Sequence, residues 1–429
     1  MSIQPLLDKL FAMTFHGIKP GLDRITSLLD GIDHPQRRYP VIHVAGTNGK
    51  GSTCAMLASI LQHAGYRVGL YTSPHIRRFN ERIRVQGAMI DDADIARLAV
   101  PLMDAAAPVG GTFFEVTTAM ALQYFAEKRV DVAVIETGLG GRLDATNVVE
   151  PILSVITSID YDHMEYLGNT LEKIASEKAG IIKESTPVVI GDTRRELRQV
   201  FERAAAQCHA PITFAHDVLR VEIDTMRQDL TMSVSVIADE LLRYYDVDLC
   251  GQHQAQNIAA VLAALPSLRE VYFIDEQHVR DGLRTVRQTT GLDGRIQLVW
   301  HDPTIVMDVS HNPAGIATLV STLAACGFPP ASWQVVFGAM ADKDVQGMLQ
   351  ALAPFTASLH VCTPDLPRAM PVSELVNLAH QCNIAPVVPH ISVAEACGMA
   401  GAMGPTLICG SFHVADEALA WLQDQGDRK

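Results

Sequence analysis

The chain has 429 residues, of which 48% are hydrophobic and 19% charged, and its formal net charge is −14. That length exceeds what one hydrophobic core usually serves, so we expect two domains. The negative charge, with no long Lys or Arg run to offset it, argues against nucleic acid as the main partner. A nucleotide or another acidic substrate would therefore need local basic residues and Mg²⁺.

Cysteine usage and the N-terminus indicate a cytoplasmic protein. The eight cysteines are scattered and form no C-x-x-C pair, as expected of reduced thiols rather than of disulfides or a zinc site. The first residues, MSIQPLLDKLF, do not have the basic region and long apolar run of a signal peptide. No stretch has the length and apolar character of a membrane span.

Two helices are predicted before the first strand. Residues 3–29 are mostly helical in pattern, with a break at residues 16–21, where HGIKPG contains one proline and two glycines. The second helix is expected to begin at Leu22 and to end near Gly31.

A glycine-rich loop then organises the chain. The short apolar run at residues 41–44 predicts a buried strand, and residues 53–64 predict a helix with almost no charge. Three glycines and Lys50 lie between them. Glycines allow backbone N–H groups to close around phosphate oxygens, while the helix start and the lysine add positive charge. The loop therefore predicts a phosphate site, with Ser52 or Thr53 placing a hydroxyl near Mg²⁺.

The strict G-x-x-x-x-G-K-[ST] pattern is nevertheless not met. Val44 stands five residues before Gly49, and Gly51 separates Lys50 from Ser52. A plain glycine-rich turn therefore stays open as an alternative on the loop alone.

Polar residues follow three further predicted strands, at the position where α/β folds bind ligands. Ser73 follows the first strand, and Glu136 ends the second before a glycine loop, where it could reach the metal of a nucleotide. His163 follows the third among carboxylates and could be a ligand, a base or a capping group. No second His or Cys stands at a zinc spacing from it. The three strands are residues 66–71, 130–136 and 151–158.

Helices are predicted at residues 91–107, 112–126, 171–182 and 196–206, with a strand near residue 187. By its pattern alone, Lys178 is a solvent-exposed helix lysine. Residues 219–245 alternate like a small antiparallel sheet, and an Ala-rich helix runs from Asn257 to residue 265. The polar, glycine-containing segment 285–295 is the predicted interdomain linker.

Strands and helices alternate strictly in the last third of the chain, which predicts a mostly parallel sheet with helices on both faces. Residues 341–344, ADKD, resemble the guanine-reading N-K-x-D box but have no Asn, so they do not indicate GTP. The expected strands are 305–309, 334–338, 357–362, 385–388 and 406–409, and the expected helices end at residues 325, 352, 381, 402 and 423.

Together the motifs make the chain similar to the folylpolyglutamate synthase family, which includes bifunctional bacterial dihydrofolate synthases and shares its architecture with Mur ligases. One departure is DVSHN, where the family commonly has DGAHN. Asp308, His311 and Asn312 are retained. The motifs are, in order, HVAGTNGKGS, YTSPH with FNERI, FFEVTTAMA, ETGLGGRLDATN, SIDYDH with LG, IASEKAGIIK, GQHQAQN, GR, DVSHNP and FGAMADKD.

The resemblance implies an α/β protein with two domains. Residues 1–288 would form a P-loop mononucleotide-binding domain with a mostly parallel sheet. Residues 289–429 would form a smaller, Rossmann-like α/β domain. The active site would lie between them, and closure of the second domain would complete it.

The resemblance also implies ATP-dependent amide formation. A carboxylate of a pteroate or folate takes the γ-phosphoryl group of ATP, the amine of L-glutamate attacks the acyl phosphate, and phosphate leaves. Two Mg²⁺ sites, ATP as co-substrate and a CO₂-derived carbamate on Lys178 are implied, with small molecules as partners and a monomer as the default. The residues that bind glutamate are not singled out.

Site residues are carried over on the matching motifs. The implied ATP contacts are Asn48, Gly49, Lys50, Gly51, Ser52, Asn257, Arg295 and Asp308. The implied metal ligands are Ser73, Glu136, His163 and carbamylated Lys178, and the implied catalytic group is Lys50, Lys178, Asp308 and His311. The implied pterin contacts are Gly21, Leu22, Asp23, Thr112, Phe113, Phe114, Glu115, Thr117, Thr118, Leu143, Asp144 and Ala145.

Two alternatives stay open at this point. A Mur-type ligase would join an amino acid to a UDP-linked cell-wall precursor, although Gly51 stands where Mur ligases usually carry Thr. A P-loop switch or binding protein would hydrolyse nucleotide to drive a partner, although no guanine-reading box of the right form is present.

Overall fold

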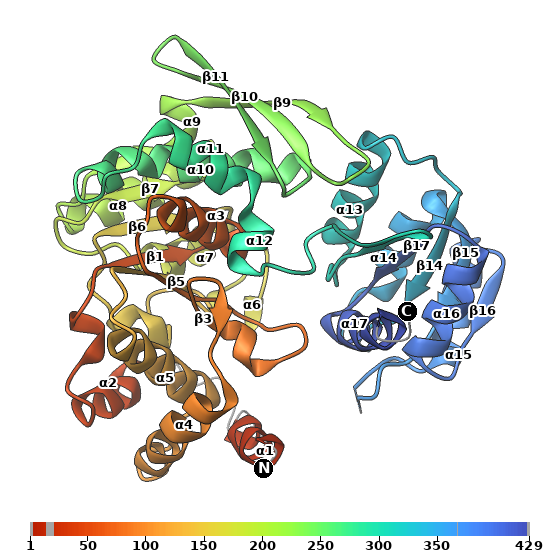
Figure 1. Cartoon of the computed structure of the whole chain (residues 1–429), viewed down its shortest axis with the longest axis horizontal. Helices are drawn as coiled ribbons and strands as arrows, with labels where there is room; N and C mark the ends of the chain where they lie inside the picture. Colours follow the sequence, from red (N-terminus) through yellow and green to blue (C-terminus); the bar gives the residue numbers. More distant parts are fainter. Residues whose placement is uncertain (1–2, 14–20, 367, 427–429) are drawn as a thin grey trace.

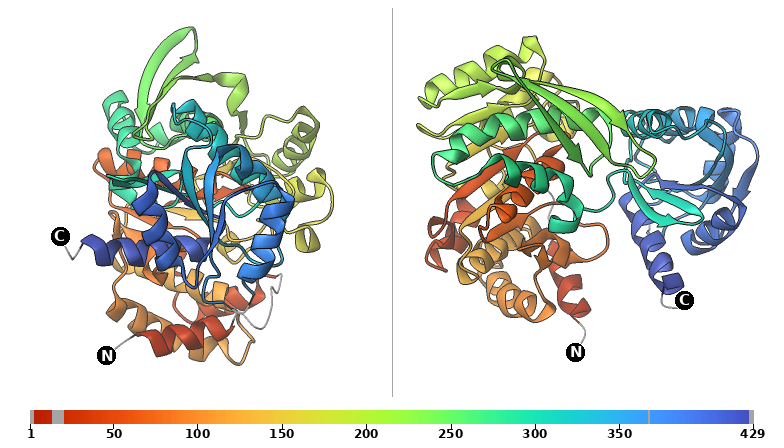
Figure 2. Two further views of the ribbon diagram at one scale, coloured as in Figure 1. Left: turned by 90° about the vertical axis from the view of Figure 1, so that its right-hand side faces the viewer. Right: turned by 45° about the horizontal axis from the view of Figure 1, so that its top comes forward.

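The computed structural model describes residues 3–13, 21–366 and 368–426 (Figure 1). It contains sheets of eight, three and six strands. The first two sheets and their helices form one part of the molecule, and the six-stranded sheet with its helices forms a second part beside it (Figure 2). The predicted α/β class is confirmed. Within the described ranges, no helix combines the length and apolar character needed to cross a membrane.

The eight-stranded sheet has the order β4-β3-β2-β5-β1-β6-β7-β8, with β3 and β4 antiparallel at one edge and the other strands parallel. In register, Val44 of β1 lies beside Glu136 of β5 and Val155 of β6, so these strands end together at one edge. The bounds are β1 Val41–Ala45, β2 Val68–Tyr71, β3 Ile83–Val85, β4 Ala88–Met89, β5 Val132–Glu136, β6 Leu153–Ile156, β7 Val188–Ile190 and β8 Ile212–Phe214.

Helices cover both faces of this sheet, which is why its strands read as short apolar runs. Ile42 and Val44 of β1 face a core shared with α3 and α10, whereas Val41 faces the core of α2, α4 and α5. The helices are α1 Gln4–Ala12, α2 Asp23–Asp30, α3 Lys50–His63, α4 Asp92–Ala106, α5 Phe113–Glu127, α6 Met164–Leu167, α7 Leu171–Ala179, α8 Arg198–Gln207, α9 Ala215–Val218, α10 Gln252–Arg269, α11 Glu276–Arg284 and α12 Val286–Thr290.

The uncharged helix α3 lies inside this part of the molecule. All its residues from Gly51 to Leu61 are buried, beneath α10, α11 and α12. Its low charge is therefore a consequence of burial on nearly all sides. Within the predicted N-terminal helical region, the break at residues 16–21 lies outside the described residues except for Gly21.

The alternating segment 219–245 forms the predicted antiparallel sheet, in the order β11-β10-β9. One face of β10, with Met232, Val234 and Val236, packs into the core that also contains residues of α10. The hairpin formed by β10 and β11 projects at the top of Figure 1. The strands are β9 Arg220–Met226, β10 Met232–Ala238 and β11 Leu241–Val247.

The six-stranded sheet has the order β12-β13-β17-β14-β15-β16, with only β12 antiparallel. The predicted alternation is confirmed, and β12 was not predicted. The strands are β12 Gln297–His301, β13 Thr304–Met307, β14 Trp333–Phe337, β15 Thr356–Val361, β16 Val387–Pro389 and β17 Thr406–Cys409. The helices are α13 Pro313–Ala325, α14 Val345–Leu352, α15 Val372–Gln381, α16 Val393–Met403 and α17 Phe412–Gly426.

The predicted linker at residues 285–295 is wrong in its first half. Val286 and Thr290 are buried because α12 packs against α3. Gly291, at φ +66°, ends that helix, and the chain then crosses to β12. The strand β8 and the helix α11 were also not predicted.

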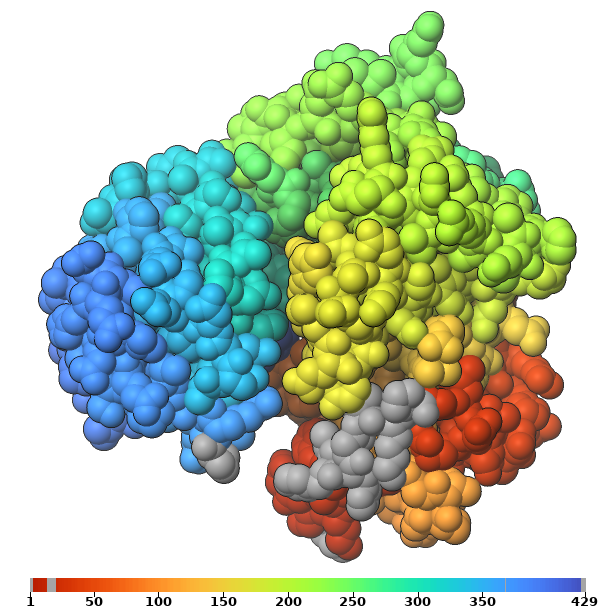
Figure 3. Space-filling model, turned by 180° about the vertical axis from the view of Figure 1, so that it is seen from behind, coloured from red at the N-terminus to blue at the C-terminus, as the bar shows by residue number. Residues whose placement is uncertain are grey.

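The two parts touch beyond this crossing. Helix α13 packs on α10, and the sulfur atoms of Cys250 and Cys326 lie 3.5 Å apart. One apolar core cluster includes buried residues of both parts, such as Leu249 and Leu323. In Figure 3 the second part, in cyan and blue, and the yellow segment after β6 face each other across a groove.

Candidate active site

The glycine loop after β1 has the backbone of a phosphate cradle. Gly46 has φ +153° and Gly49 has φ +85°, conformations that favour glycine. A Cβ on Gly46 would lie 1.8 Å from Oγ1 of Thr157, and one on Gly49 would lie 2.1 Å from Oδ1 of Asn257. Both glycines are therefore required by close neighbours, and Asn257 of α10 lies against the loop.

Two lysines meet at one carbonyl of this loop. Nζ of Lys50 donates to the carbonyls of Gly46 and Thr47, at 3.1 Å each. Nζ of Lys178, from α7, donates to the same Gly46 carbonyl at 2.7 Å. The backbone oxygen is thus a point where the amino groups of two lysines from distant segments converge.

Lys178 is 3% exposed, so the interpretation of this residue as a solvent-exposed helix lysine is wrong. Residues 171–179 do form a helix, but α7 turns this side chain toward the glycine loop. Burial lowers the pKa of Lys178 to about 7, and the charge of Lys50 acts in the same direction. A large fraction of this amine is therefore neutral near pH 7.

Ser73 and Glu136 lie together across the β2–β5 pair. The backbone N–H of Ser73 donates to Oε2 of Glu136 at 3.0 Å. Burial raises the pKa of Glu136, while Lys50 and Arg295 oppose that effect. Of the described residues, Ser73 alone donates a hydrogen bond to this carboxylate, so Oε1 is left for a cation.

His163 lies half-exposed at φ 47° in the loop that follows β6. Its Nε2 is 3.6 Å from Oδ2 of Asp162. Burial lowers the pKa of His163, and three lysines act in the same direction, namely Lys343, Lys50 and Lys178. The carboxylate of Asp162 opposes this effect and raises the pKa of His163.

Of the predicted metal ligands, Ser73 and Glu136 are hydrogen-bonded to each other. Lys178 reaches the glycine loop from α7, and His163 belongs to the loop after β6. The described residues contain no group of three or more His, Cys, Asp and Glu side chains arranged for a metal ion. A hydroxyl, one carboxylate, one imidazole and a lysine nonetheless fit Mg²⁺ when phosphate oxygens complete its coordination.

The second part contributes Arg295, Asp308 and His311. A Cβ on Gly51 would lie 3.9 Å from Nη2 of Arg295, so this guanidinium reaches the start of α3. Asp308 accepts from the backbone N–H groups of Ile296 and Ser310, at 2.8 Å each. Both of its oxygens are thus used to fix the segments that carry Arg295 and His311.

His311 has a defined orientation. Its Nδ1 lies 3.0 Å from the carbonyl of Val309 and donates to it, so Nε2 carries the lone pair when the ring is neutral. The ring centroid is 5.7 Å from that of Phe412. Phe412, Arg295 and Glu136 also line a cavity between the two parts.

The rest of the predicted ATP set surrounds the loop. Ser52 is buried at the start of α3, where Nε2 of Gln254 lies 3.4 Å from its hydroxyl. Gln254 also accepts from Nδ2 of Asn257 at 2.9 Å. Asn48 is exposed, and its carbonyl accepts from Thr157 at 2.7 Å.

The predicted pterin contacts gather on the other face of the sheet. Glu115 accepts from the N–H of Thr112 at 2.7 Å and from Nε of Arg24 at 2.9 Å, which joins α5 to the start of α2. The guanidinium of Arg82 lies over the ring of Phe113, 5.2 Å from its centroid. This arrangement brings Gly21, Leu22 and Asp23 near the start of α5.

Other members of that set make contacts within the fold. Tyr71 lies within hydrogen-bond distance of Thr117 and Thr118, at 3.2 and 3.3 Å. A Cβ on Gly138 would lie 2.4 Å from the ring of Phe114. Asp144, between Leu143 and the buried Ala145, accepts from Leu139 N–H at 2.7 Å, so it shapes the loop after β5.

Sequence reasoning missed Arg82 as a site residue. It is 8% exposed, burial lowers its pKa, and Glu136 opposes that effect. Arg82 lies within the FNERI motif, so a signal was present, but a charged loop normally predicts solvent exposure.

Two family models match the chain. The Mur ligase middle domain matches residues 44–265, and the Mur ligase glutamate ligase domain matches residues 294–412. Among solved structures, E. coli FolC in complex with DHPP and ADP is 30% identical with a TM-score of 0.86, covering 99% of this chain and 98% of that one. The fold and the site therefore define an ATP-dependent ligase with Mur ligase architecture.

Curated relatives narrow this class. Dihydrofolate synthase/folylpolyglutamate synthase of Bacillus subtilis is 40% identical over 86% of each chain. That of Haemophilus influenzae is 36% identical over 94% of this chain and 93% of its own. The chain belongs to the dihydrofolate synthase/folylpolyglutamate synthase family and is an ATP-dependent glutamate ligase.

Ligands occur in related structures. A bifunctional folylpolyglutamate synthase/dihydrofolate synthase with Mn, AMPPNP and L-glutamate bound is 28% identical with a TM-score of 0.82, covering 99% of this chain and 98% of that one. These comparisons favour the folate ligase over the cell-wall ligase and the P-loop switch.

Proposed function

We propose that this ligase adds L-glutamate both to dihydropteroate and to the glutamate tail of reduced folates. The observation that carries the proposal is the convergence of Lys50 and Lys178 on the Gly46 carbonyl, with Glu136 close to Lys50. Such a site concentrates cationic groups where ATP and a substrate carboxylate must approach each other despite their like charge.

The reaction proceeds in two steps. A carboxylate oxygen of the pteroate or folate attacks the γ-phosphorus of ATP, and ADP leaves. The neutral amine of glutamate then attacks the acyl carbon of the acyl phosphate, and phosphate departs with the electron pair of the broken C–O bond. The protein binds and orients the partners and neutralises their charge, because phosphoryl transfer needs little covalent participation from side chains.

Each residue group has a role in this scheme. Asn48, Gly49, Lys50, Gly51 and Ser52 would bind the triphosphate, while Asn257 and Arg295 contact ATP from α10 and from the second part. Asp308 is assigned to the ATP-binding residues because its carboxylate holds the backbone next to Arg295 and next to His311. Nε2 of His311 would face the reacting groups.

Two Mg²⁺ ions are proposed. Ser73 and Glu136 would hold one, and His163 and Lys178 the other. Bound there, Mg²⁺ supplies neutralisation of phosphate and acyl oxygens.

A carbamate on Lys178 would make this residue a metal ligand. Its amine is buried and crowded by Lys50, so the neutral form that reacts with CO₂ is accessible. The nitrogen lone pair would form a C–N bond to CO₂ while one C–O π bond opens, and the nitrogen would then release a proton to solvent. The product presents two anionic oxygens, which are hard ligands suited to Mg²⁺.

The pterin is proposed to bind at the face formed by α2, α5 and the loop after β5. This assigns Gly21, Leu22, Asp23, Thr112, Phe113, Phe114, Glu115, Thr117, Thr118, Leu143, Asp144 and Ala145 to that side. The ion pair between Arg24 and Glu115 supports a common surface. We further propose that residues 1–288 and 289–429 are the two functional domains. The protein is proposed to be a monomer located in the cytoplasm.

The test is ADP release by purified protein with Mg²⁺, ATP and L-glutamate. One reaction receives dihydropteroate and another a tetrahydrofolate, and products are weighed by mass spectrometry. Turnover with both establishes both activities. Turnover with the folate alone removes the dihydropteroate part of the proposal, and no turnover with either by folded protein overturns it.

A further inference from the structure

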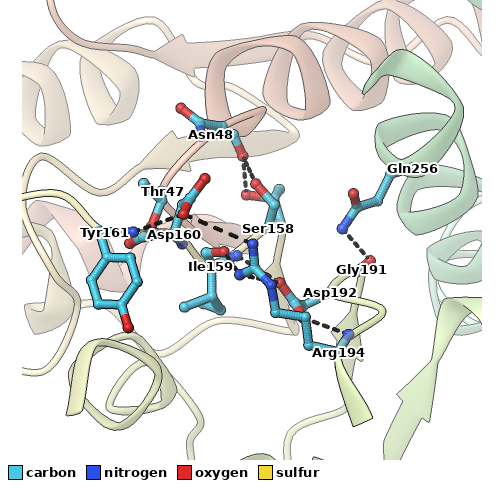
Figure 4. A network of polar contacts seen from close by, with 11 residues as sticks. Thr47, Asn48, Ser158, Ile159, Asp160, Tyr161, Gly191, Asp192, Arg194 and Gln256 are labelled. Atoms are coloured by element: carbon cyan, nitrogen blue, oxygen red, sulfur yellow. Dashed lines mark hydrogen bonds and ion pairs between the residues drawn. The ribbon is translucent and has the colours of Figure 1, made fainter. Parts of the chain in front are cut away.

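A turn outside every predicted site joins three elements of the active site. It comprises residues 191–194, between β7 and α8 (Figure 4). Its neighbours are the glycine loop after β1, the loop after β6 that carries His163, and helix α10 that carries Asn257. None of its four residues belongs to a motif that predicted chemistry.

The turn binds both ends of one residue in the loop after β6. Oδ2 of Asp192 accepts from the N–H of Ile159 at 2.7 Å, and the guanidinium of Arg194 donates to the Ile159 carbonyl. The Asp192 carboxylate also accepts from the N–H of Arg194 at 2.8 Å. The Ile159 side chain is buried beside Leu197, so both backbone and side chain fix this position.

Ile159 in turn fixes the glycine loop through its neighbours. The N–H of Thr47 donates to the carbonyl of Ser158 at 2.7 Å, and the Thr47 hydroxyl accepts from the N–H of Asp160 at 2.9 Å. The hydroxyl of Ser158 donates to the carbonyl of Asn48 at 3.1 Å. The Thr47 carbonyl is one of the two that hold Lys50, so the chain of contacts reaches the phosphate-binding lysine.

The same turn contacts α10. Nε2 of Gln256 donates to the Gly191 carbonyl at 2.8 Å, and the N–H of Gly191 donates to Ile156 at 2.7 Å. Gln256 precedes Asn257, whose amide lies against Gly49. One turn thus connects both sides of the glycine loop.

We infer that Asp192 and Arg194 are positioning residues for the ligase reaction, acting through Ile159 on the glycine loop. Arg194 is aided by Asp160, whose Oδ1 lies 3.8 Å from its Nη2. The inference rests on the proposed function for the identity of the acceptor substrate, but its effect on nucleotide binding does not depend on that acceptor.

The placement predicts a selective loss. Misplacing Thr47, whose carbonyl holds Lys50, weakens MgATP binding and catalysis. The proposed pterin surface on α2 and α5 lies on the other face of the sheet and is not touched by the turn. A purely structural role would instead lower stability and change all substrate affinities together.

The experiment compares Arg194→Ala, Arg194→Lys and Asp192→Asn with Arg198→Ala as the matched control. Arg198 begins the same helix and pairs with Glu202 and Asp217, at 2.8 Å each. It makes no ion pair or hydrogen bond with residues 158–163 in the described part of the chain. Steady-state kinetics, binding of AMPPNP with Mn²⁺ by calorimetry and the unfolding temperature are measured for each full-length variant.

We expect Arg194→Ala to raise the KM for MgATP and the Kd for AMPPNP about tenfold and to lower kcat. The KM for the folate should stay within about twofold, since its proposed surface is untouched. Asp192→Asn should act in the same direction, Arg194→Lys should be intermediate, and Arg198→Ala should match the wild type.

Three results would overturn the inference. They are unchanged AMPPNP affinity in both Arg194→Ala and Asp192→Asn, an equal rise in the KM of the folate, or an equal effect in Arg198→Ala. If Arg194→Ala does not fold, Arg194→Lys and Asp192→Asn decide the matter. Absence of folate-dependent turnover in the wild type would count against the proposed function alone, because AMPPNP binding still reports on positioning.

Discussion

The two parts of the molecule present their strand ends to the same site in different ways. In the first part, loops after β1, β6 and β7 are bound to one another through Thr47, Ile159 and Asp192. In the second part, Asp308 is bound to Ile296 and Ser310, and the Arg287 guanidinium of α12 is the contact that ties the Arg295 carbonyl to the first part, at 2.7 Å.

This difference separates two tasks. A network of bonds among loops preorganises the phosphate site before the substrates meet. Single side chains on a second body can be brought to that site and withdrawn with it. Loss of Lys178 at the glycine loop of the first part should therefore reduce catalysis most, and loss of Arg295 from the second part should mainly weaken assembly of the site.

The largest effect is expected for Lys178→Ala. Removing the buried amine removes the contact with Gly46 and the proposed carbamate, so kcat should fall about 100-fold or more. ADP release measures this, with the unfolding temperature as a check on the fold. Lys183→Ala is the matched control, since Lys183 follows the same helix and donates instead to the Asn147 carbonyl at 2.9 Å. Turnover near the wild-type rate in Lys178→Ala would refute the assignment.

Arg295→Ala tests the second part. This guanidinium reaches the start of α3 across the junction, so its loss should raise the KM for MgATP about tenfold while the fold persists. Arg284→Ala, which removes an exposed pair with Asp281, should leave the KM unchanged. An Arg295→Ala enzyme with wild-type KM and kcat would show that the second part does not contribute charge to the site.

Acidification should lower the stability of the second part, because that part contains a buried histidine pair. His360 Nδ1 lies 2.9 Å from His390 Nε2, and His360 Nε2 lies 3.2 Å from Oε1 of Gln334. With His390 donating, His360 accepts at Nδ1 and donates at Nε2, so a proton added to Nδ1 would face another donor. Burial lowers the pKa of His360 to about 4.

The sign of the pH effect follows from that pKa. Between about pH 4 and 6.5 the unfolded chain binds more protons than the folded one, so this stability is complete above pH 6.5 and is lost as pH falls toward 4. At pH 5 the cost is about 2 kcal/mol. Denaturant unfolding at pH 7 and 5 measures it. His360→Leu should lose less stability on acidification than the wild type, and an equal loss would contradict the assignment.

The smallest effect is expected for Thr112→Ala in the first part. Thr112 caps α5, and its N–H and hydroxyl both bind Oε2 of Glu115. Loss of such a cap costs about 1 kcal/mol, which thermal unfolding would detect as a small decrease in Tm. The KM for MgATP should not change. A changed KM for MgATP would mean that the two faces of the sheet are coupled.

Local sequence patterns were sufficient to predict those elements whose residues all have the same kind of surroundings. The strands β1, β5 and β6 are buried on both faces, so short apolar runs identified them, and the polar residues after them marked the sheet edge that carries Glu136 and His163. The helices predicted to begin at residues 91 and 112 are α4 and α5, whose N-cap residues are Asp91 and Thr112. These features depend on residues close together in the chain.

Packing between distant segments decided the rest. The charged neighbours of Lys178 on α7 predict a surface lysine, yet its Nζ donates a hydrogen bond to the carbonyl of Gly46, 132 positions away. The sequence of residues 286–290 predicts a linker, but in the fold these residues pack against α3. Asp192 and Arg194 belong to no recognisable motif. Whether a polar side chain is solvated or binds a particular carbonyl depends on which segment packs against it, and that is a property of the tertiary structure.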